Sequence, residues 1–277
     1  RAVPADLAII TSLSLEHTDI LGGTLEAIAA EKAAIARPMK PMFVRDVADQ
    51  GARRSIQRAA DDAGNPEIGE QPAAAQLHWV EIEPEADYFD EARAMAAAAW
   101  GSLTCAEKTK FPNFRGLHWP GRMHEVVRAG SGQRWLLEGA HNPSGMETSC
   151  RALQRDERWK NPWALLFGST PQSEMGAMLE PLVNLCRRHP PVAIVLTEPQ
   201  FGRYPGVPCT ELANALGRHD LQISASFANP QEAVAWVEAR SSTLTDVLCI
   251  GSLYLAGNVL QALGADDDEA LSIVAKD

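Results

Sequence analysis

The second half of the chain alternates between short apolar segments and segments with helical periodicity. Short apolar runs that are bounded by turn-forming residues are typical of buried strands. We predict strands at 134–138, 163–168, 192–197, 221–226 and 246–251, and helices at 143–155, 173–188, 209–217, 230–240 and 253–263. Strands that are separated by helices favour a mostly parallel sheet covered on both faces. The pattern therefore places the chain in the α/β class.

The first half has the same alternation in a less regular form. We predict strands at 7–13, 42–44 and 77–82, and helices at 24–36, 51–63 and 90–103. Residues 107–121 are polar and aromatic and are interrupted by proline and glycine, which is typical of a connection between domains. Because 277 residues exceed the usual size of one domain, we expect two.

Charge and cysteine content exclude several classes of function. With 25 basic and 36 acidic residues the formal charge is −11, so we expect no nucleic-acid partner. The sequence has no run of 18 apolar residues and no signal peptide, so we expect no membrane partner. Five cysteines without a C-x-x-C pair indicate reduced thiols and a cytoplasmic protein. Arg1 in place of methionine suggests that the chain begins inside a larger protein.

Residues 135–145 join an apolar strand to a helix through a turn that carries polar side chains. Glu138 would lie at the carboxyl end of the strand, where open α/β sheets bind ligands. Asn142 can cap the next helix and Pro143 suits its first turn, so free backbone N–H groups would face the same crevice. An anion such as phosphate could bind there. The alternative is an ordinary strand-to-helix connection with a capping asparagine.

Lys32 lies on the apolar stripe of the predicted helix 24–36, together with Leu25, Ile28 and Ile35. An unpaired cation is costly on a buried stripe. Either the aliphatic part of the lysine side chain extends so that the ammonium group reaches water, or the amine is neutral and takes part in a chemical reaction. A neutral amine can react with carbon dioxide to form a carbamate, which resembles a carboxylate as a metal ligand.

His17 follows the first predicted strand and is flanked by Glu16 and Asp19. A loop histidine is most often a surface or hydrogen-bonded residue, although neutral imidazole is also a common metal ligand. One histidine with hard oxygen neighbours would suit Mg²⁺ that bridges to phosphates better than a structural zinc ion.

Four segments carry a resemblance to a known family. They are Ser-Leu-Glu-His-Thr-Asp-Ile-Leu-Gly at 14–22 with Ala-Glu-Lys-Ala-Ala-Ile at 30–35, Trp-Pro-Gly-Arg-Met-His-Glu-Val at 119–126, Leu-Glu-Gly-Ala-His-Asn-Pro at 137–143, and Gly-Ser-Leu-Tyr-Leu-Ala-Gly at 251–257. Their order and spacing resemble the folylpolyglutamate synthase and dihydrofolate synthase family of the Mur ligase superfamily. The resemblance implies the remainder of a P-loop-type central ATPase domain at 1–117, a hinge at 118–122 and a Rossmann-like glutamate ligase domain at 123–277.

The resemblance also implies roles for single residues. In the family, the residues that match His17 and Lys32 support metal ions, and the lysine is carbamylated, which makes Lys32 a catalytic candidate. Arg122 matches the arginine that contacts ATP phosphates at the hinge. We expect its replacement by alanine to impair the use of ATP with little loss of stability.

Three residues of the segment 137–143 complete the candidate site. Glu138 and His141 match an acidic residue and a histidine that contact the nucleotide or order the closed site. His141 is thereby implied as a catalytic and nucleotide-binding residue, with Asn142 beside it. Glu138 and Glu16 each stand where the family usually has aspartate.

The implied reaction is ATP-dependent amide formation. A folate or pteroate carboxylate is phosphorylated with the help of Mg²⁺, and the amine of L-glutamate attacks the acyl phosphate. The chain contains no G-x-x-G-K-[ST] phosphate-binding loop, so we expect activity only together with a missing N-terminal region, in an intact enzyme that is monomeric. The alternatives are a related Mur-type ligase with a different acceptor, and a non-catalytic nucleotide-binding or interaction protein.

Overall fold

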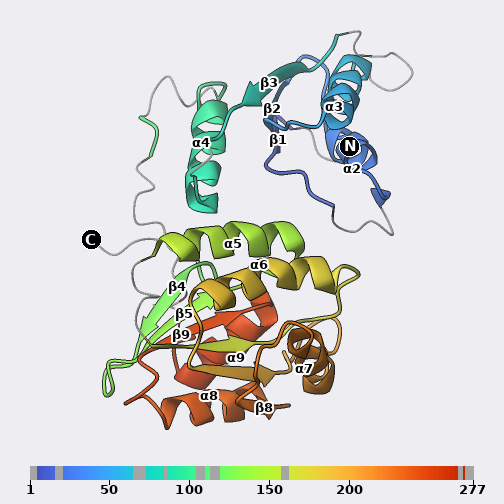
Figure 1. Cartoon of the computed structure of the whole chain (residues 1–277). Coiled ribbons are helices and arrows are strands. Elements are labelled where there is room, and N and C mark those ends of the chain that lie inside the picture. Colours follow the sequence, from blue (N-terminus) through green and yellow to red (C-terminus); the bar gives the residue numbers. More distant parts are fainter. Residues whose placement is uncertain are drawn as a thin grey trace. The chain divides into compact units, whose positions relative to one another are not determined.

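A computed structural model of the chain describes residues 5–15, 21–64, 73–83, 86–103, 110–112, 119–156, 162–267 and 271. The chain divides into two compact units, Arg1–Phe114 (unit 1) and Arg115–Asp277 (unit 2). Each unit contains its own parallel or mostly parallel sheet (Figure 1). The predicted α/β class is therefore confirmed.

Unit 1 is a three-layer arrangement of one small sheet between helices (Figure 1). Its strands are parallel and lie in the order β1-β2-β3. The elements are β1 (Ala8–Ile10), α2 (Leu25–Ala33), β2 (Pro41–Arg45), α3 (Gln50–Asp62), β3 (Gln76–Val80) and α4 (Tyr88–Trp100). Because side chains of a strand alternate between faces, Met42 and Val44 pack with α2 and α3, whereas Phe43 packs with Met95 and Ala99 of α4.

Unit 2 is built around a six-stranded sheet in the order β4-β5-β9-β6-β7-β8, in which only β4 is antiparallel to its neighbour. Its strands are β4 (His124–Val127), β5 (Arg134–Glu138), β6 (Trp163–Phe167), β7 (Ala193–Thr197), β8 (Ala225–Phe227) and β9 (Asp246–Ile250). Its helices are α5 (Pro143–Arg155), α6 (Met175–Arg188), α7 (Cys209–Gly217), α8 (Pro230–Glu238) and α9 (Leu253–Leu263).

The connections of unit 2 create a switch point between β5 and β9. The chain moves in one direction along the sheet from β5 to β8, so α5, α6 and α7 share one face and one apolar core. It then returns to β9, and α8 and α9 pack on the other face. The helices that follow β5 and β9 therefore leave the sheet on opposite faces. Such a switch point, at the carboxyl ends of two neighbouring strands, is where open α/β sheets bind ligands.

Several predicted boundaries need correction. The helix 24–36 ends at Ala33, and Ile35 is 41% exposed, so the apolar stripe does not extend to that residue. The strand at 7–13 is only Ala8–Ile10, and the strand at 221–226 is Ala225–Phe227. Sequence analysis missed β4 altogether because its four residues, His-Glu-Val-Val, are too few to form an alternating or a continuous apolar pattern.

The cysteines described by the structure are free and buried. Burial raises the pKa of Cys186 to about 12 and that of Cys209 to about 11, and it raises the pKa of Cys150 and Cys249 further. In a Cys105→Ser variant, we therefore expect native protein to react with none of its four thiols in a disulfide-exchange reagent at neutral pH, and unfolded protein to react with all four. A thiol that reacts before unfolding would contradict its burial.

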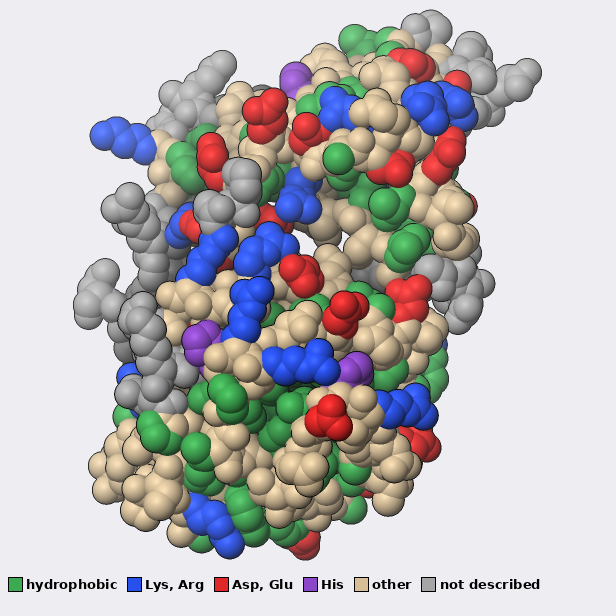
Figure 2. Space-filling model, viewed as in Figure 1, with side chains coloured by type: hydrophobic (Ala, Val, Ile, Leu, Met, Phe, Trp, Pro, Cys, Tyr) green, Lys and Arg blue, Asp and Glu red, His purple; other side chains and the backbone are tan. Residues whose placement is uncertain are grey.

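The surface of unit 2 is mixed. On the face shown in Figure 2, its acidic and basic side chains are interspersed among hydrophobic ones. Among the described residues, none of the helices has the length and apolar character that crossing a membrane requires.

Candidate functional site

A buried carboxylate lies at the carboxyl end of β5. The side chain of Glu138 is fully buried, and both of its oxygens accept bonds from the segment that precedes β4. Nη1 of Arg122 lies 3.2 Å from Oε1, and the backbone N–H of Met123 donates to Oε2 at 3.0 Å. A buried charge is tolerated only when it is paired and hydrogen-bonded, and Glu138 meets both conditions. Its burial makes it a positioning residue for Arg122.

The turn that carries Arg122 is tied to the sheet through its backbone. Gly121 has φ of +73°, a conformation that favours glycine, and its carbonyl accepts from Gly139 N–H at 2.7 Å. Its own N–H donates to Nδ1 of the buried His124 at 3.4 Å. A side chain on Gly139 would collide with Leu253 of α9. The arginine is therefore presented from a turn that is held against β5 and α9.

His141 lies three residues beyond the end of β5. Its Nδ1 lies 2.8 Å from the carbonyl oxygen of Gly139. Because a carbonyl oxygen can only accept, this bond places a proton on Nδ1 and leaves Nε2 for another partner. The imidazole is only half-buried, so this nitrogen can reach a ligand at the edge of the sheet.

Asn142 begins α5 as predicted. Its side-chain oxygen accepts from the backbone N–H of Gly145 at 2.7 Å, and Pro143 occupies the first helical position. The cap explains part of the segment without any ligand, as the alternative interpretation proposed. The N-terminus of α5 nevertheless lies directly after the residues that position Arg122, and its partial positive charge favours an anion.

We expect Asn142→Ala to lower the free energy of unfolding by about 1 kcal/mol, because it removes the side-chain cap of α5. Chemical denaturation measures this value. Asn229→Ala at the start of α8 is the matched control, since Asn229 caps its helix in a related way at 2.9 Å. A nucleotide-binding defect in the first variant alone would assign Asn142 a role beyond capping.

Lys32 lies in unit 1, in the last turn of α2. The side chain is half-buried, and its Nζ donates to the carbonyl oxygen of Ser12 at 3.3 Å. Ser12 follows β1, so the amine is at the carboxyl edge of the unit 1 sheet. The position fits both alternatives, a cation near a helix C-terminus and an amine that is modified for metal binding.

Of the residues predicted to surround a metal ion, Lys32 lies within the described part of the chain. His17, Glu16 and Asp19 lie outside the described residues. Within the described part of the chain, no group of three or more His, Cys, Asp or Glu side chains could hold a metal ion. The structure thus brings together Arg122 and Glu138, with His141 and Asn142 following in the same segment, and places Lys32 in the other unit.

Sequence analysis missed the groups that hold the arginine. The N–H of Met123 and the carbonyl of Gly121 are backbone groups, and the ring of His124 accepts from a backbone N–H. No residue pattern specifies this geometry. The Pro-Gly pair at 120–121 was a usable signal, because it marks a tight turn.

Comparisons with known proteins agree with the resemblance found in the sequence. No family model matches the chain. It is 25% identical over 290 residues to the folylpolyglutamate synthase of Lacticaseibacillus casei, a match that covers 93% of this chain and 62% of that protein. The structure superposes on E. coli FolC in complex with DHPP and ADP with a TM-score of 0.67 at 22% identity, covering 94% of this chain and 62% of the other.

A second solved structure gives the same result. The Yersinia pestis bifunctional folylpolyglutamate synthase/dihydrofolate synthase, complexed with AMPPNP and Mn ion, matches with a TM-score of 0.64 at 22% identity, again over 94% of this chain and 62% of the other. The chain is thus similar in sequence and in fold to folylpolyglutamate and dihydrofolate synthases. The fold of these synthases covers both of its units. The match covers 36% of the mitochondrial folylpolyglutamate synthase of Cricetulus griseus and 62% of the Lacticaseibacillus casei protein. The chain therefore spans less than two thirds of the length of these two proteins.

Proposed function

We propose that the chain is part of an ATP-dependent ligase that joins L-glutamate to a folate or pteroate carboxylate. In this proposal ATP phosphorylates the carboxylate, and the glutamate amine displaces phosphate from the acyl phosphate to form the amide. The observation that carries the proposal is the held arginine: Arg122 is paired to a fully buried Glu138 at the ligand-binding edge of the unit 2 sheet.

The residues of unit 2 have separate tasks in the proposed reaction. Arg122 stabilises negative charge on the phosphates, since only one of its guanidinium nitrogens is bonded to Glu138. Glu138 fixes the position of that guanidinium. His141 offers Nε2 to the nucleotide, and Asn142 orients the N-terminus of α5.

Unit 1 supplies the proposed metal site. Mg²⁺ would neutralise charge that develops on the transferred phosphoryl group. Lys32 as a carbamate and His17 are the proposed ligands. The donor chemistry fits, because Lys32 lies beside an oxygen at the carboxyl edge of the unit 1 sheet. Solved relatives bound to ADP, or to AMPPNP with Mn ion, support a nucleotide and a divalent metal.

The remaining parts of the proposal concern partners and location. Free, buried thiols support a reducing compartment such as the cytoplasm. We propose that the intact enzyme is monomeric and that its partners are its small-molecule substrates. In this proposal residues 118–122 are a hinge, and the domains formed by residues 1–117 and 123–277 close about it.

The decisive experiment is an assay of ADP release. We expect the full-length protein that contains this chain to release ADP only when L-glutamate and dihydropteroate or tetrahydrofolate are both present. Omission of either substrate should reduce the rate to background. ADP release with another carboxylate in place of the folate would indicate a related ligase, and binding of ATP without any release would indicate a non-catalytic protein.

A further inference from the structure

Leu253, the first residue of α9, lies against the turn that carries Arg122. A Cβ added to Gly139 would lie 2.2 Å from Cδ2 of Leu253, and one added to Gly121 would lie 3.5 Å from the same atom. Ala256, one helical turn further along α9, has its Cβ 3.4 Å from that position on Gly121. The turn therefore packs on α9 through the bare backbone of two glycines, and the leucine side chain fills the space beside both.

The position of Leu253 is only partly explained by its own burial. The residue is 42% exposed, and an apolar side chain that keeps this much surface in water gains less from burial than a core leucine does. Its contact with the two glycines has a separate consequence, because it limits how closely the turn can approach α9.

The start of α9 is fixed by its own surroundings. Gly251 joins β9 to α9 with φ of +121°, and a Cβ added there would lie 2.5 Å from the carbonyl oxygen of Gly168. Ser252 is buried, and its Oγ accepts from the N–H of Tyr254 at 3.2 Å, which caps the helix. Leu253 is therefore held at a defined place at the carboxyl edge of the sheet.

Hydrogen bonds tie the turn to β5 and its exit, but not to α9. The Gly121 carbonyl accepts from Gly139, and the N–H of Met123 donates to Glu138. Bonds to one strand leave a turn able to rotate about that strand. Such a rotation would move the guanidinium of Arg122, whose Nη1 lies 3.2 Å from Oε1 of Glu138, already at the long end of the range for this bond.

We propose that Leu253 is a positioning residue for Arg122, which keeps the turn at the distance from α9 at which the guanidinium reaches Glu138. A displacement of about 0.5 Å away from the carboxylate would break the bond between them. The consequence for the use of ATP rests on the proposed function, in which Arg122 stabilises phosphate charge. The position of Arg122 itself can be measured in the 277-residue chain without any reaction.

An exchange of volume between positions 139 and 253 tests the proposal. Leu253→Ala removes the atoms that meet the turn, and Gly139→Ala adds a Cβ that would lie 2.2 Å from Cδ2 and 2.7 Å from Cγ of Leu253. Each single variant should displace Arg122. In the double variant the new methyl group occupies the space that the leucine leaves, so the turn should return toward its original place. Gly139 does not have a positive φ, so its backbone accepts alanine.

The first measurement is the guanidinium NMR signal of Arg122 in the 277-residue chain, assigned by its absence from Arg122→Lys. We expect its loss in each single variant and its recovery in the double variant, because the bond to Glu138 protects the guanidinium protons. In the full-length protein, each single variant should raise the ATP concentration needed for half-maximal turnover about tenfold, and the double variant should lie within about twofold of the parent.

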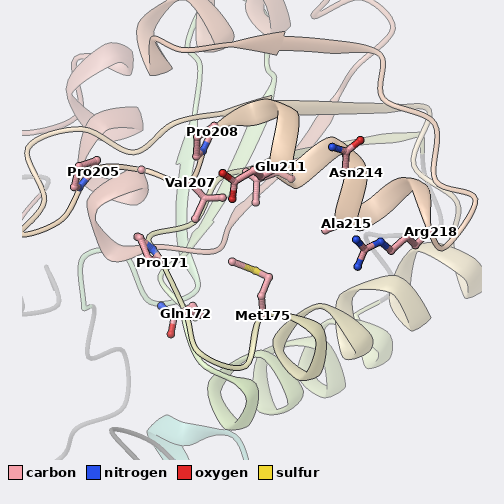
Figure 3. A pocket seen from close by; sticks show the side chains of 12 residues that line it. Pro171, Gln172, Met175, Pro205, Val207, Pro208, Glu211, Asn214, Ala215 and Arg218 are labelled. Carbon is pink, nitrogen blue, oxygen red and sulfur yellow. The ribbon is translucent and has the colours of Figure 1, made fainter. Parts of the chain in front are cut away.

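Met175→Ala and Gly257→Ala are the matched controls. Met175 is also a partly exposed apolar side chain, but it lines a cavity of about 650 Å³ between the loops that follow β6 and β7 and the helix α7 (Figure 3). Gly257 lies on α9, and a Cβ added there would meet nothing within 4 Å. Both controls should keep the Arg122 signal and the ATP requirement of the parent, whatever their effect on the free energy of unfolding.

The double variant decides between positioning and a general loss of structure. An Arg122 signal that persists in Leu253→Ala would overturn the proposal, as would a double variant with no more signal than Gly139→Ala. If Gly139→Ala alone does not fold, the double variant should restore folding, and its failure to do so would also overturn the proposal. Recovery of the signal without any change in ATP use among the variants would confirm the positioning by Leu253 and contradict the proposed role of Arg122 in the reaction.

Discussion

Replacing Lys32 with alanine is expected to reduce glutamate-dependent ADP release by the full-length protein more than about a hundredfold. A factor of this size corresponds to about 3 kcal/mol of transition-state stabilisation, which is within the range of a metal ion that neutralises phosphoryl charge. The expected structural cost is smaller. The side chain is only half-buried, and its bond to the Ser12 carbonyl contributes about 1 kcal/mol to stability.

The two explanations of Lys32 make different predictions. If the lysine is a carbamate, short carboxylates such as acetate or formate should partly restore activity to Lys32→Ala, and labelled carbon dioxide should give a carbamate NMR signal in the parent only. If the amine serves as a cation near the end of α2, neither effect should occur and activity should remain near that of the parent. Lys40→Ala is the control, because Lys40 is an exposed lysine of the same unit that pairs with Asp6.

The helix α2 shows how far periodicity alone can specify a structure. Leu25 and Ile28 lie on its packed face as the stripe predicts, since Ile28 is fully buried and Leu25 packs against the same core. The stripe fails at Ile35 because α2 ends at Ala33, although the residues up to Ala36 favour helix by composition. The residue at which a helix ends depends on tertiary packing, which helix propensity does not include.

The strands of unit 2 could be predicted from the sequence because their burial is visible in the residue pattern. Its strands β6, β7 and β9 are buried along their whole length, so each is a continuous apolar run that alternates with a helix. Turn chemistry placed Asn142 correctly at the start of α5. The order of the strands was not predictable from the pattern, because the return from β8 to β9, in the middle of the sheet, leaves no trace in periodicity.

The sequence allowed the residues of the candidate site to be predicted, but not the contacts between them. Glu138 and His141 could be singled out because they follow a buried strand. The burial of Glu138 beside Arg122 could not be inferred from the sequence, since the pairing of β4 with β5, which brings Arg122 to Glu138, was not predicted.

The structure changes the expectation for Arg122→Ala. Sequence analysis expected little loss of stability, but Arg122 is the counter-charge of a carboxylate that is fully buried. Removing it takes away the positive charge that is paired with this buried carboxylate, so we expect the free energy of unfolding to fall by about 2–4 kcal/mol. Arg122→Lys should recover part of the stability, because it keeps the charge but not the planar donor group.

The same variant should impair the use of ATP, and a second ion pair separates the two effects. Arg134 pairs with Asp246, whose side chain is 6% exposed, at the amino ends of β5 and β9. Arg134→Ala should lower the free energy of unfolding by a similar amount, because it also removes the positive charge that is paired with a buried carboxylate. Only Arg122→Ala should also raise the ATP concentration needed for half-maximal turnover, or reduce turnover itself, in the full-length protein. An equal ATP dependence in the two variants would show that Arg122 stabilises unit 2 and takes no part in the reaction.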